Sequence, residues 1–188
     1  MLANRNLGVS SHPFDYLSQL DALCRQRVAR HPTPDEGVLS FRGLSFRVAA
    51  HELLAPMDEI AEIVTPPQLT RVPSVKPWAL GIGNMRGNLL PVMDLQGFLF
   101  GENLVLNPRR QRLLVVQHAG VYVGLLVEAV IGMKRFREKD RLAQVPAVAD
   151  APRLQAFLVG AYQQAEQHYP VFSPWRLVRH TDFLNISA

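Results

Sequence analysis

A pair of glycines is the first feature of this sequence to test as a cofactor-binding motif. Gly81-Ile82-Gly83 begins like the glycine fingerprint of dinucleotide-binding proteins, in which a further glycine lets pyrophosphate approach a helix N-terminus. Arg86 stands where that glycine is required, and the residues that follow predict a turn rather than a helix. We therefore expect no nucleotide cofactor, and the rest of the chain calls for no other.

Metal-ligating and nucleophilic residues are present, but their spacing supports no chemistry. The six histidines show no close ligand spacing and the single cysteine is Cys24, so we expect no metal site. No serine or threonine stands in a nucleophile-elbow sequence, and Glu62 and Asp94 are not demonstrably a carboxylate pair. We interpret Asp94 as an acceptor at a turn or helix start. The sequence thus predicts no catalytic residues and no enzymatic activity.

Composition and charge limit the classes of protein to which this chain can belong. A lone cysteine forms no internal disulfide and no signal segment opens the chain, so we expect a cytoplasmic protein. The apolar runs are shorter than the roughly 20 residues that span a bilayer, which predicts no direct membrane insertion. The net charge of +4 and the basic stretch at residues 134–141 would suit an acidic partner or nucleic acid. Aromatic residues are not interleaved with the basic ones, so nucleic-acid binding is the alternative rather than the main hypothesis.

The first part of the chain differs in pattern from the rest. Residues 13–29 follow a helical period and predict one amphipathic helix, whose apolar stripe is Phe14, Leu17, Leu20, Cys24 and Val28. Two prolines and a glycine at 31–37 predict a linker, so residues 1–37 form an expected appendage. From Leu39 onward the period becomes that of strands, because Leu44, Phe46 and Val48 alternate with polar residues.

Short strands separated by proline and glycine continue to the end of the chain. We expect them at residues 53–55, 59–64, 80–86, 89–93, 113–117, 121–133, 157–162 and 168–172. Ser173-Pro174 predicts the start of a C-terminal helix that runs toward Leu184, since a hydroxyl caps the first turn and proline suits the first helical position. This pattern favours an all-β fold built on small closed barrels, which leave no sheet edge exposed.

The hairpin expected at residues 81–95 carries the most distinctive signature. Gly87-Asn88 is a two-residue loop that accommodates positive φ, and apolar arms flank it. Pro91 has no N–H to donate, so the second arm is expected at a sheet edge or beside a bulge. The order Asn-hydrophobic-Arg-Gly, then Pro91, then Asp94-Leu95, resembles the central signature of the CheW family, scaffold proteins that join bacterial chemoreceptors to a histidine kinase.

The resemblance covers most of the chain, in four segments at 43–64, 81–95, 123–130 and 158–184. It implies two five-stranded SH3-like β-barrels packed side by side, intertwined within residues 38–184 and lacking an active site. Within the family, the sequence is most similar to the PilI group. These are coupling proteins of the chemosensory system that controls type IV pili and twitching motility. That likeness lies in Pro13-Phe14, Cys24-Arg25, Lys76-Pro77-Trp78, Gly97-Phe98-Leu99 and Val171-Phe172-Ser173-Pro174.

The resemblance also implies a receptor-binding site. In the family, a glutamate and an arginine at the positions of Glu62 and Arg86 approach each other near the receptor groove. We therefore expect Ile60, Glu62 and Arg86 to bind the cytoplasmic tip of a methyl-accepting chemoreceptor. An ordinary strand-to-strand ion pair is the structural alternative, and Ile60 and Ile63 could equally belong to the core or to the groove wall. Strand alternation predicts that at least one apolar side chain shares the face of Glu62.

A second expected surface binds the regulatory domain of a CheA-like histidine kinase. Leu69 and Val72 lie in a loop stiffened by prolines, and rigid apolar side chains lose little entropy on docking. We assign Leu69, Val72 and Gly81 to this surface, although Leu69 and Val72 could equally cap the core of one barrel. The resulting hypothesis is a non-enzymatic adaptor located at membrane-associated receptor arrays.

Overall fold

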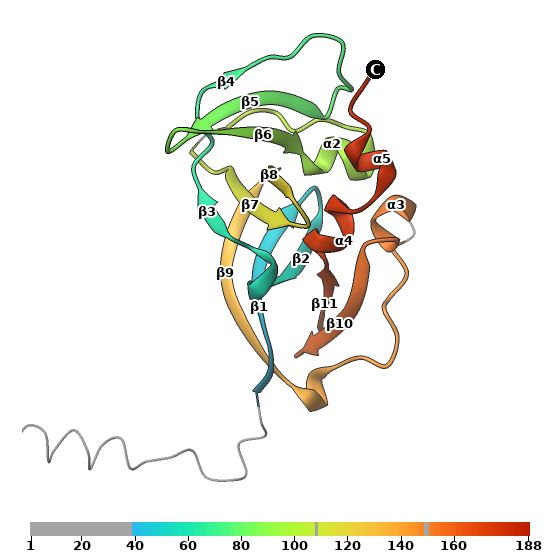
Figure 1. Ribbon diagram of the computed structural model, residues 1–188. Helices are drawn as coiled ribbons and strands as arrows, with labels where there is room; N and C mark the ends of the chain where they lie inside the picture. The colour runs from blue at the N-terminus through green and yellow to red at the C-terminus, as the bar shows by residue number, and fades with distance from the viewer. Residues whose placement is uncertain (1–38, 108, 149–150) are drawn as a thin grey trace, which may run out of the picture. The chain divides into compact units, whose positions relative to one another are not determined.

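The computed structural model describes residues 39–107, 109–148 and 151–188, and these are mostly β-structure (Figure 1). The strands are β1 Leu39–Val48, β2 His51–Pro56, β3 Glu62–Val64, β4 Leu69–Thr70, β5 Ala79–Met85, β6 Asn88–Asp94, β7 Arg112–His118, β8 Val121–Val127, β9 Ala129–Arg137, β10 Leu158–Gln164 and β11 Gln167–Phe172. The helical segments are η1 Met57–Glu59, α2 Leu95–Phe100, η2 Glu138–Asp140, α3 Pro152–Gln155, α4 Pro174–Val178 and α5 Thr181–Leu184. The helix expected at 13–29 and the linker at 31–37 lie outside the described residues.

The strands form two sheets. The five-stranded sheet has the order β10-β11-β2-β1-β9, and the six-stranded sheet has the order β3-β7-β8-β6-β5-β4. Most neighbours are antiparallel, but β2 pairs with β11 and β6 with β8 in parallel. The predicted β-rich class is confirmed. The hydrogen-bonded order of each sheet is open, and β4 adds a sixth strand where five were expected.

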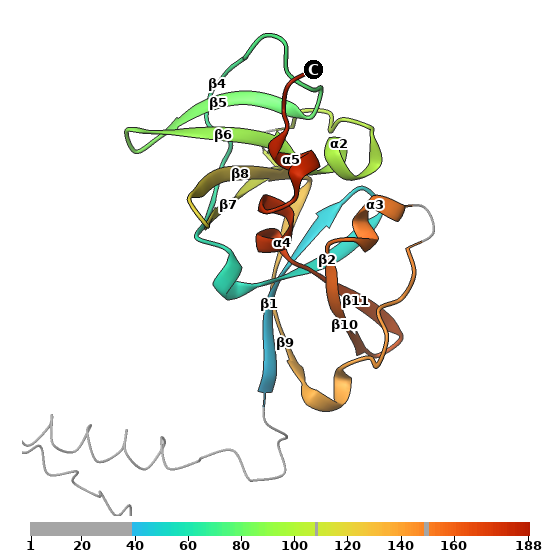
Figure 2. The same ribbon diagram turned by 45° about the vertical axis from the view of Figure 1, so that its right-hand side comes forward.

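One apolar core is shared by both sheets and the C-terminal helices. It takes Phe46 and Leu53 from the five-stranded sheet, Leu114 and Leu125 from the six-stranded sheet, and Phe183 from α5. Figure 2 shows α4 and α5 beside strands of both sheets. Because each sheet contributes a face to this core, the two sheets are held as one body.

Each sheet also has a second core of its own. Leu54 lies between Leu53 and Ala55 of the shared core but belongs to a separate cluster with Phe136 and Tyr169. Leu113 likewise packs in a cluster of the six-stranded sheet, although the next residue, Leu114, faces the shared core. Successive side chains of a strand point to opposite faces, so strands apolar on both faces can serve two cores.

The single strand expected at 121–133 is wrong. The chain leaves the six-stranded sheet at the end of β8 and enters the five-stranded sheet with β9, and Glu128 stands between them. The Glu128 N–H donates to the carbonyl of Arg47, at 3.1 Å, which fixes the chain where it crosses. Apolar residues flank the crossing on both sides, since β8 ends in buried residues and β9 begins with Ala129, Val130 and Ile131, although Ile131 is 46% exposed. The sequence pattern therefore showed no break there.

The β5–β6 hairpin is confirmed, with its turn one residue earlier than expected. Met85 pairs with Asn88, so the loop is Arg86-Gly87, and both residues have positive φ, of 51° and 87°. The Asn84 side-chain carbonyl accepts from the Gly87 N–H at 2.9 Å. Positive φ at both loop positions matches the twist of the flanking strands.

Pro91 does not lie on an edge strand, because β6 is flanked by β8 and β5. The parallel ladder with β8 begins only at Val92, one residue later. The register of β5 shifts between Ala79 and Gly81, which pair with Met93 and Val92. The strand pairing therefore supports the second of the two expectations, that Pro91 lies beside a bulge.

Two helix-start expectations are confirmed. Asp94 is fully buried and caps α2, because its carboxylate accepts from the N–H groups of Gly97 at 3.1 Å and Leu104 at 2.7 Å. Burial raises the pKa of Asp94, and these backbone hydrogen bonds offset that rise only in part. The Ser173 hydroxyl accepts from the Arg176 N–H at 3.2 Å at the start of α4.

Other expected elements differ in length. The strand expected at 59–64 is shortened to β3, because Glu59 belongs to η1. The single C-terminal helix is divided into α4 and α5, and His180 caps the second by accepting from the Asp182 N–H at 3.3 Å. Among the described residues, no helix combines the length and apolar character that crossing a bilayer requires.

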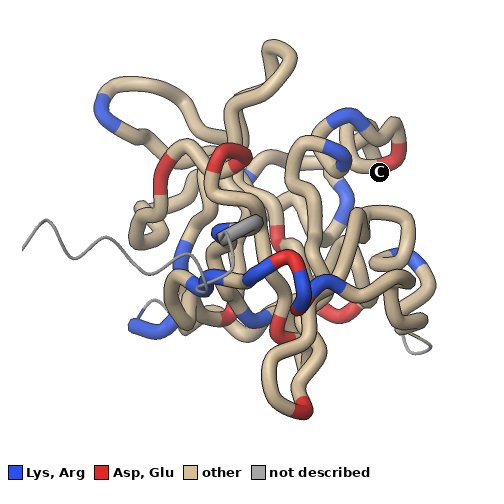
Figure 3. Tube along the Cα trace, turned by 90° about the horizontal axis from the view of Figure 1, so that it is seen from below, with Lys and Arg blue, Asp and Glu red and all other residues tan. Residues whose placement is uncertain are grey.

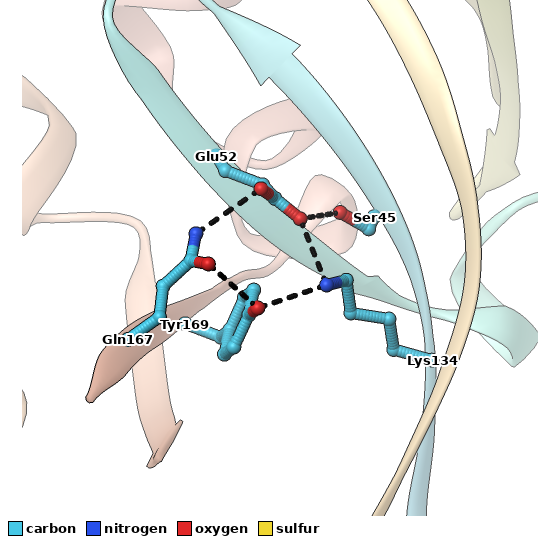
Figure 4. A network of polar contacts seen from close by, with 5 residues as sticks. All are labelled: Ser45, Glu52, Lys134, Gln167 and Tyr169. Atoms are coloured by element: carbon cyan, nitrogen blue, oxygen red, sulfur yellow. Dashed lines mark hydrogen bonds and ion pairs between the residues drawn. The ribbon is translucent and has the colours of Figure 1, made fainter. Parts of the chain in front are cut away.

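A polar network joins four strands of the five-stranded sheet (Figure 4). Lys134 lies 3.3 Å from Glu52 and donates to the Tyr169 hydroxyl at 2.9 Å. Ser45 and Gln167 both donate to the Glu52 carboxylate. Ser45 is fully buried, although the alternation of β1 predicted an exposed side chain, because this hydrogen bond satisfies its hydroxyl.

The network shifts the pKa of both charged members toward the charged form. Burial alone would raise the pKa of Glu52, but hydrogen bonds from Ser45, Lys134 and Gln167 and the charge of Lys134 together lower it. Burial would similarly lower the pKa of Lys134, but hydrogen bonds with Tyr169 and Glu52 and the charge of Glu52 together raise it.

These shifts predict an acid-sensitive contribution to stability. Because the folded-state pKa of Glu52 lies below its ordinary value of 4.5, its contribution is present above that pH and is lost as the pH falls through the folded-state pKa. Glu52→Gln should therefore reduce the steepness with which the free energy of unfolding falls on acidification, as measured by urea denaturation at a series of pH values. Glu166→Gln, in the exposed turn between β10 and β11, is the matched control. An acid dependence equal to that of the wild type in Glu52→Gln would contradict the role of the network.

Candidate functional site

The sequence-predicted Glu62 and Arg86 meet on the surface. Arg86 donates from Nη1 to Oε1 of Glu62 at 2.8 Å, and the two side chains are 74% and 35% exposed. Glu62 lies on β3 and Arg86 lies in the turn after β5, although β7, β8 and β6 stand between these strands in the sheet order. The six-stranded sheet must therefore curl strongly to bring its β3 edge to the hairpin.

The residues around Glu62 alternate as predicted. Ile60, Glu62 and Val64 are half-buried, whereas the residues that follow each of them are exposed. Ile60 packs against the shared core and Val64 against the core of the six-stranded sheet. Ile63, which is 41% exposed, is thus the more accessible isoleucine beside the ion pair.

The ion pair borders a surface hollow of about 550 Å³. Its walls include Met85, Leu89 and Tyr122 from three neighbouring strands, and Leu89 is 70% exposed. Sequence reasoning treated Leu89 only as an arm of the hairpin. The available signal was strand alternation, because the burial of Leu90 and Val92 places Leu89 on the opposite, exposed face.

The hollow combines apolar side chains with a single ion pair. Its lining contains one carboxylate and one guanidinium, and these are already paired with each other. The described ranges of the chain also contain no group of three or more histidine, cysteine, aspartate and glutamate side chains that could hold a metal ion. The site therefore offers an apolar wall beside two accessible opposite charges.

The residues predicted to bind a kinase lie around β4. Leu69 is half-buried against the core of the six-stranded sheet, while Val72 is 36% exposed in the following loop. Gly81 is buried on β5, where it has a φ of 141° and a Cβ would lie 2.3 Å from the Thr70 carbonyl oxygen. Gly81 thus allows β4 to approach, and Val72 is the most exposed of the three.

Two basic side chains of the stretch at 134–141 are paired within the domain. Lys134 pairs with Glu52, and Arg141 lies 3.5 Å from Glu138. Seen from below, basic and acidic residues are interspersed along the chain (Figure 3). Such mixed charge lacks the single-sign stripe that tracks a nucleic-acid backbone.

Comparison with known proteins identifies a matching family model and similar proteins. A family model described as CheW-like domain matches residues 42–182. Protein PilI of Pseudomonas aeruginosa is 40% identical over 94% of this chain and 97% of its own length. Chemotaxis protein CheW of Helicobacter pylori is 37% identical over 51% of this chain and 59% of its own length.

A solved structure shares the fold. The scaffolding protein TtCheW from Thermoanaerobacter tengcongensis superposes with a TM-score of 0.60, at 23% identity, over 70% of this chain and 88% of that one. The predicted resemblance to the CheW family and to its PilI group is confirmed.

The close approach at Gly81 yields a stability prediction. Gly81→Ala should lower the free energy of unfolding by about 1–3 kcal/mol, because the residue combines an unfavourable φ with a collision against β4. Gly120→Ala is the matched control, because it also has positive φ, of 80°, but has open space around its Cα. Urea denaturation of both variants should show the larger loss for Gly81→Ala. Equal losses would mean that contact with β4 does not constrain this position.

Proposed function

The chain belongs to the CheW-like domain family, and on that premise we propose that it is a non-enzymatic coupling protein joining a chemoreceptor to a CheA-like histidine kinase. The similarity to Protein PilI over nearly the whole chain supports a role in the chemosensory control of type IV pili and twitching motility. Protein FrzA of Myxococcus xanthus, 33% identical over 52% of this chain, is a further relative.

The proposal includes an SH3-like barrel at each sheet. Two observations support this: each sheet has an apolar cluster of its own, and the Glu62–Arg86 contact joins strands that are distant in the sheet order. A barrel would leave its outer surface available for partners on several sides at once, which suits an adaptor.

The receptor surface consists of Ile60, Glu62 and Arg86, extended by Leu89 in the adjoining hollow. An exposed ion pair contributes only about 0–1 kcal/mol to stability, so the fold does not depend on keeping these two charges paired. They can therefore exchange partners with the cytoplasmic coiled-coil tip of a methyl-accepting chemoreceptor, while Leu89 supplies apolar contact. The observation that carries the proposal is this accessible pair at the signature turn.

The kinase surface consists of Leu69, Val72 and Gly81. Val72 offers an exposed apolar contact, and Gly81 sets the position of β4 beneath it. The partner is the barrel-type regulatory domain of the kinase. Coupling requires no chemistry from the adaptor, because a coupling free energy of about 1–3 kcal/mol between the two docking events changes kinase activity several-fold. Such a protein acts in the cytoplasm at membrane-associated receptor arrays, without a cofactor.

The receptor role predicts a selective loss of binding. Arg86→Glu should weaken binding of a coiled-coil receptor-tip fragment at least tenfold, equivalent to about 1.4 kcal/mol, because it places two carboxylates at the docking surface. Its melting temperature should stay within a few degrees of the wild type, since the lost pair is exposed. Isothermal titration calorimetry and thermal melting measure the two effects.

Arg110→Glu, an exposed arginine in the loop before β7, makes the same charge change elsewhere and should bind normally. Equal weakening by both variants would assign the effect to net charge. Normal receptor binding by Arg86→Glu, or retention of the wild type on nucleic acid without protein partners, would contradict the proposal.

A further inference from the structure

The last residues of the chain pair with the loop that carries Val72. After α5, the chain runs antiparallel to residues 74–76, with Ser187 opposite Val75. The Lys76 N–H donates to the Ile186 carbonyl at 2.9 Å, and the Ala188 N–H donates to the Ser74 carbonyl at 3.2 Å. We refer to residues 185–188 as the strap. Its contacts tie down a loop whose residues 71–74 are all exposed.

The strap also completes an apolar hollow of about 130 Å³. Val72 and Val75 line it from the loop, Gly81 and Met93 from the sheet, and Ile186 from the strap. Ile186 packs at the same time against the shared core. Pockets for small-molecule ligands are typically about 300–1,000 Å³, so this hollow is of a size for a single apolar side chain.

We infer that the strap is part of the kinase-docking surface: it orders the Val72 loop and forms one wall of a socket for an apolar side chain of the kinase regulatory domain. The identity of this partner rests on the proposed function. The socket adjoins two of the residues assigned to kinase binding, Val72 and Gly81, both of which line it.

The charges around the socket specify the partner further. Arg71 and Lys76 are the charged residues of the loop between β4 and β5, and both are basic. Each directly adjoins a lining residue in the sequence, Val72 or Val75, and basic residues next to an apolar socket complement an apolar side chain with a carboxylate beside it. The regulatory domain should therefore present such a pair.

The geometry favours a strap that orders the docking loop before the partner binds, rather than a strap that covers the docking site. Ile186 forms a wall of the hollow and leaves it open, and the hydrogen bonds of the strap hold the loop rather than cover Val72. A loop ordered before docking loses less conformational entropy on binding. Loosening the strap should therefore weaken docking, and fixing it in place should not.

Two changes loosen the strap and leave every residue of the two sheets unchanged. Ala188→Pro removes the N–H that donates to Ser74, and Ile186→Ala removes the side chain that the strap contributes to the socket wall and to the edge of the shared core. Each should weaken binding of the isolated kinase regulatory domain about tenfold in calorimetry. Leu184→Ala, an exposed residue of α5 that does not line the hollow, is the matched control and should bind like the wild type.

A disulfide can fix the strap. Val75 and Ser187 form a non-hydrogen-bonded antiparallel pair, for which the Cα separation of about 4.5 Å suits a disulfide. In a Cys24→Ser background, the Val75→Cys/Ser187→Cys variant should bind at least as tightly when oxidised as when reduced. Loss of binding on oxidation would show that the strap must leave and would overturn the inference. Wild-type affinity in both Ala188→Pro and Ile186→Ala would also overturn it.

Amide hydrogen exchange separates this inference from the proposed function. In Ala188→Pro, the amides of residues 71, 72 and 74–76 should exchange faster than in the wild type, whether or not a kinase is present. If the wild type binds no kinase regulatory domain, the proposed function and the docking role both fail. Unchanged exchange in the loop would overturn the ordering role of the strap on its own.

Discussion

The structure depends on one apolar core that two sheets share. Phe46 and Leu53 of the five-stranded sheet pack in the same cluster as Leu114 and Leu125 of the six-stranded sheet, and Phe183 joins them from the C-terminal end. Interiors packed in this way do not deform continuously, so the shared core gives a rigid support to the six-stranded sheet, which carries both proposed docking surfaces. A protein that couples two partners without chemistry needs such a body, because a change in how one partner docks reaches the other only through a rigid connection.

Local chemistry made much of this fold predictable from the sequence. The alternation of Leu44, Phe46 and Val48 identified the buried face of β1, and Asp94 and Ser173 identified two helix starts. The hairpin was found because its turn residues have a direct conformational role, even though the turn lies at Arg86-Gly87 rather than one residue later. In each case the decisive interaction lies within a few residues in the sequence.

Features that depend on distant residues were not predictable in this way. The crossing at Glu128 lies inside an apolar run that continues from the buried end of β8 into the apolar start of β9, and its position is fixed by a carbonyl on β1. Ser45 is buried because Glu52 on the neighbouring strand accepts from it. The hollow beside Arg86 and the pairing of Ser187 with Val75 require the curled sheet and the folded C-terminal residues. The proximity of Glu62 to Arg86 was expected from family resemblance, and the structure supplies its geometry.

The central claim is that this chain transmits receptor state to a kinase by holding both on one rigid body. Its most direct test is the autophosphorylation rate of a purified CheA-like kinase from the same organism, measured with a chemoreceptor signalling fragment in the presence and absence of this protein. The account predicts that the receptor changes the kinase rate several-fold only when the protein is present. A receptor effect of the same size without it, or none with it, would contradict the account.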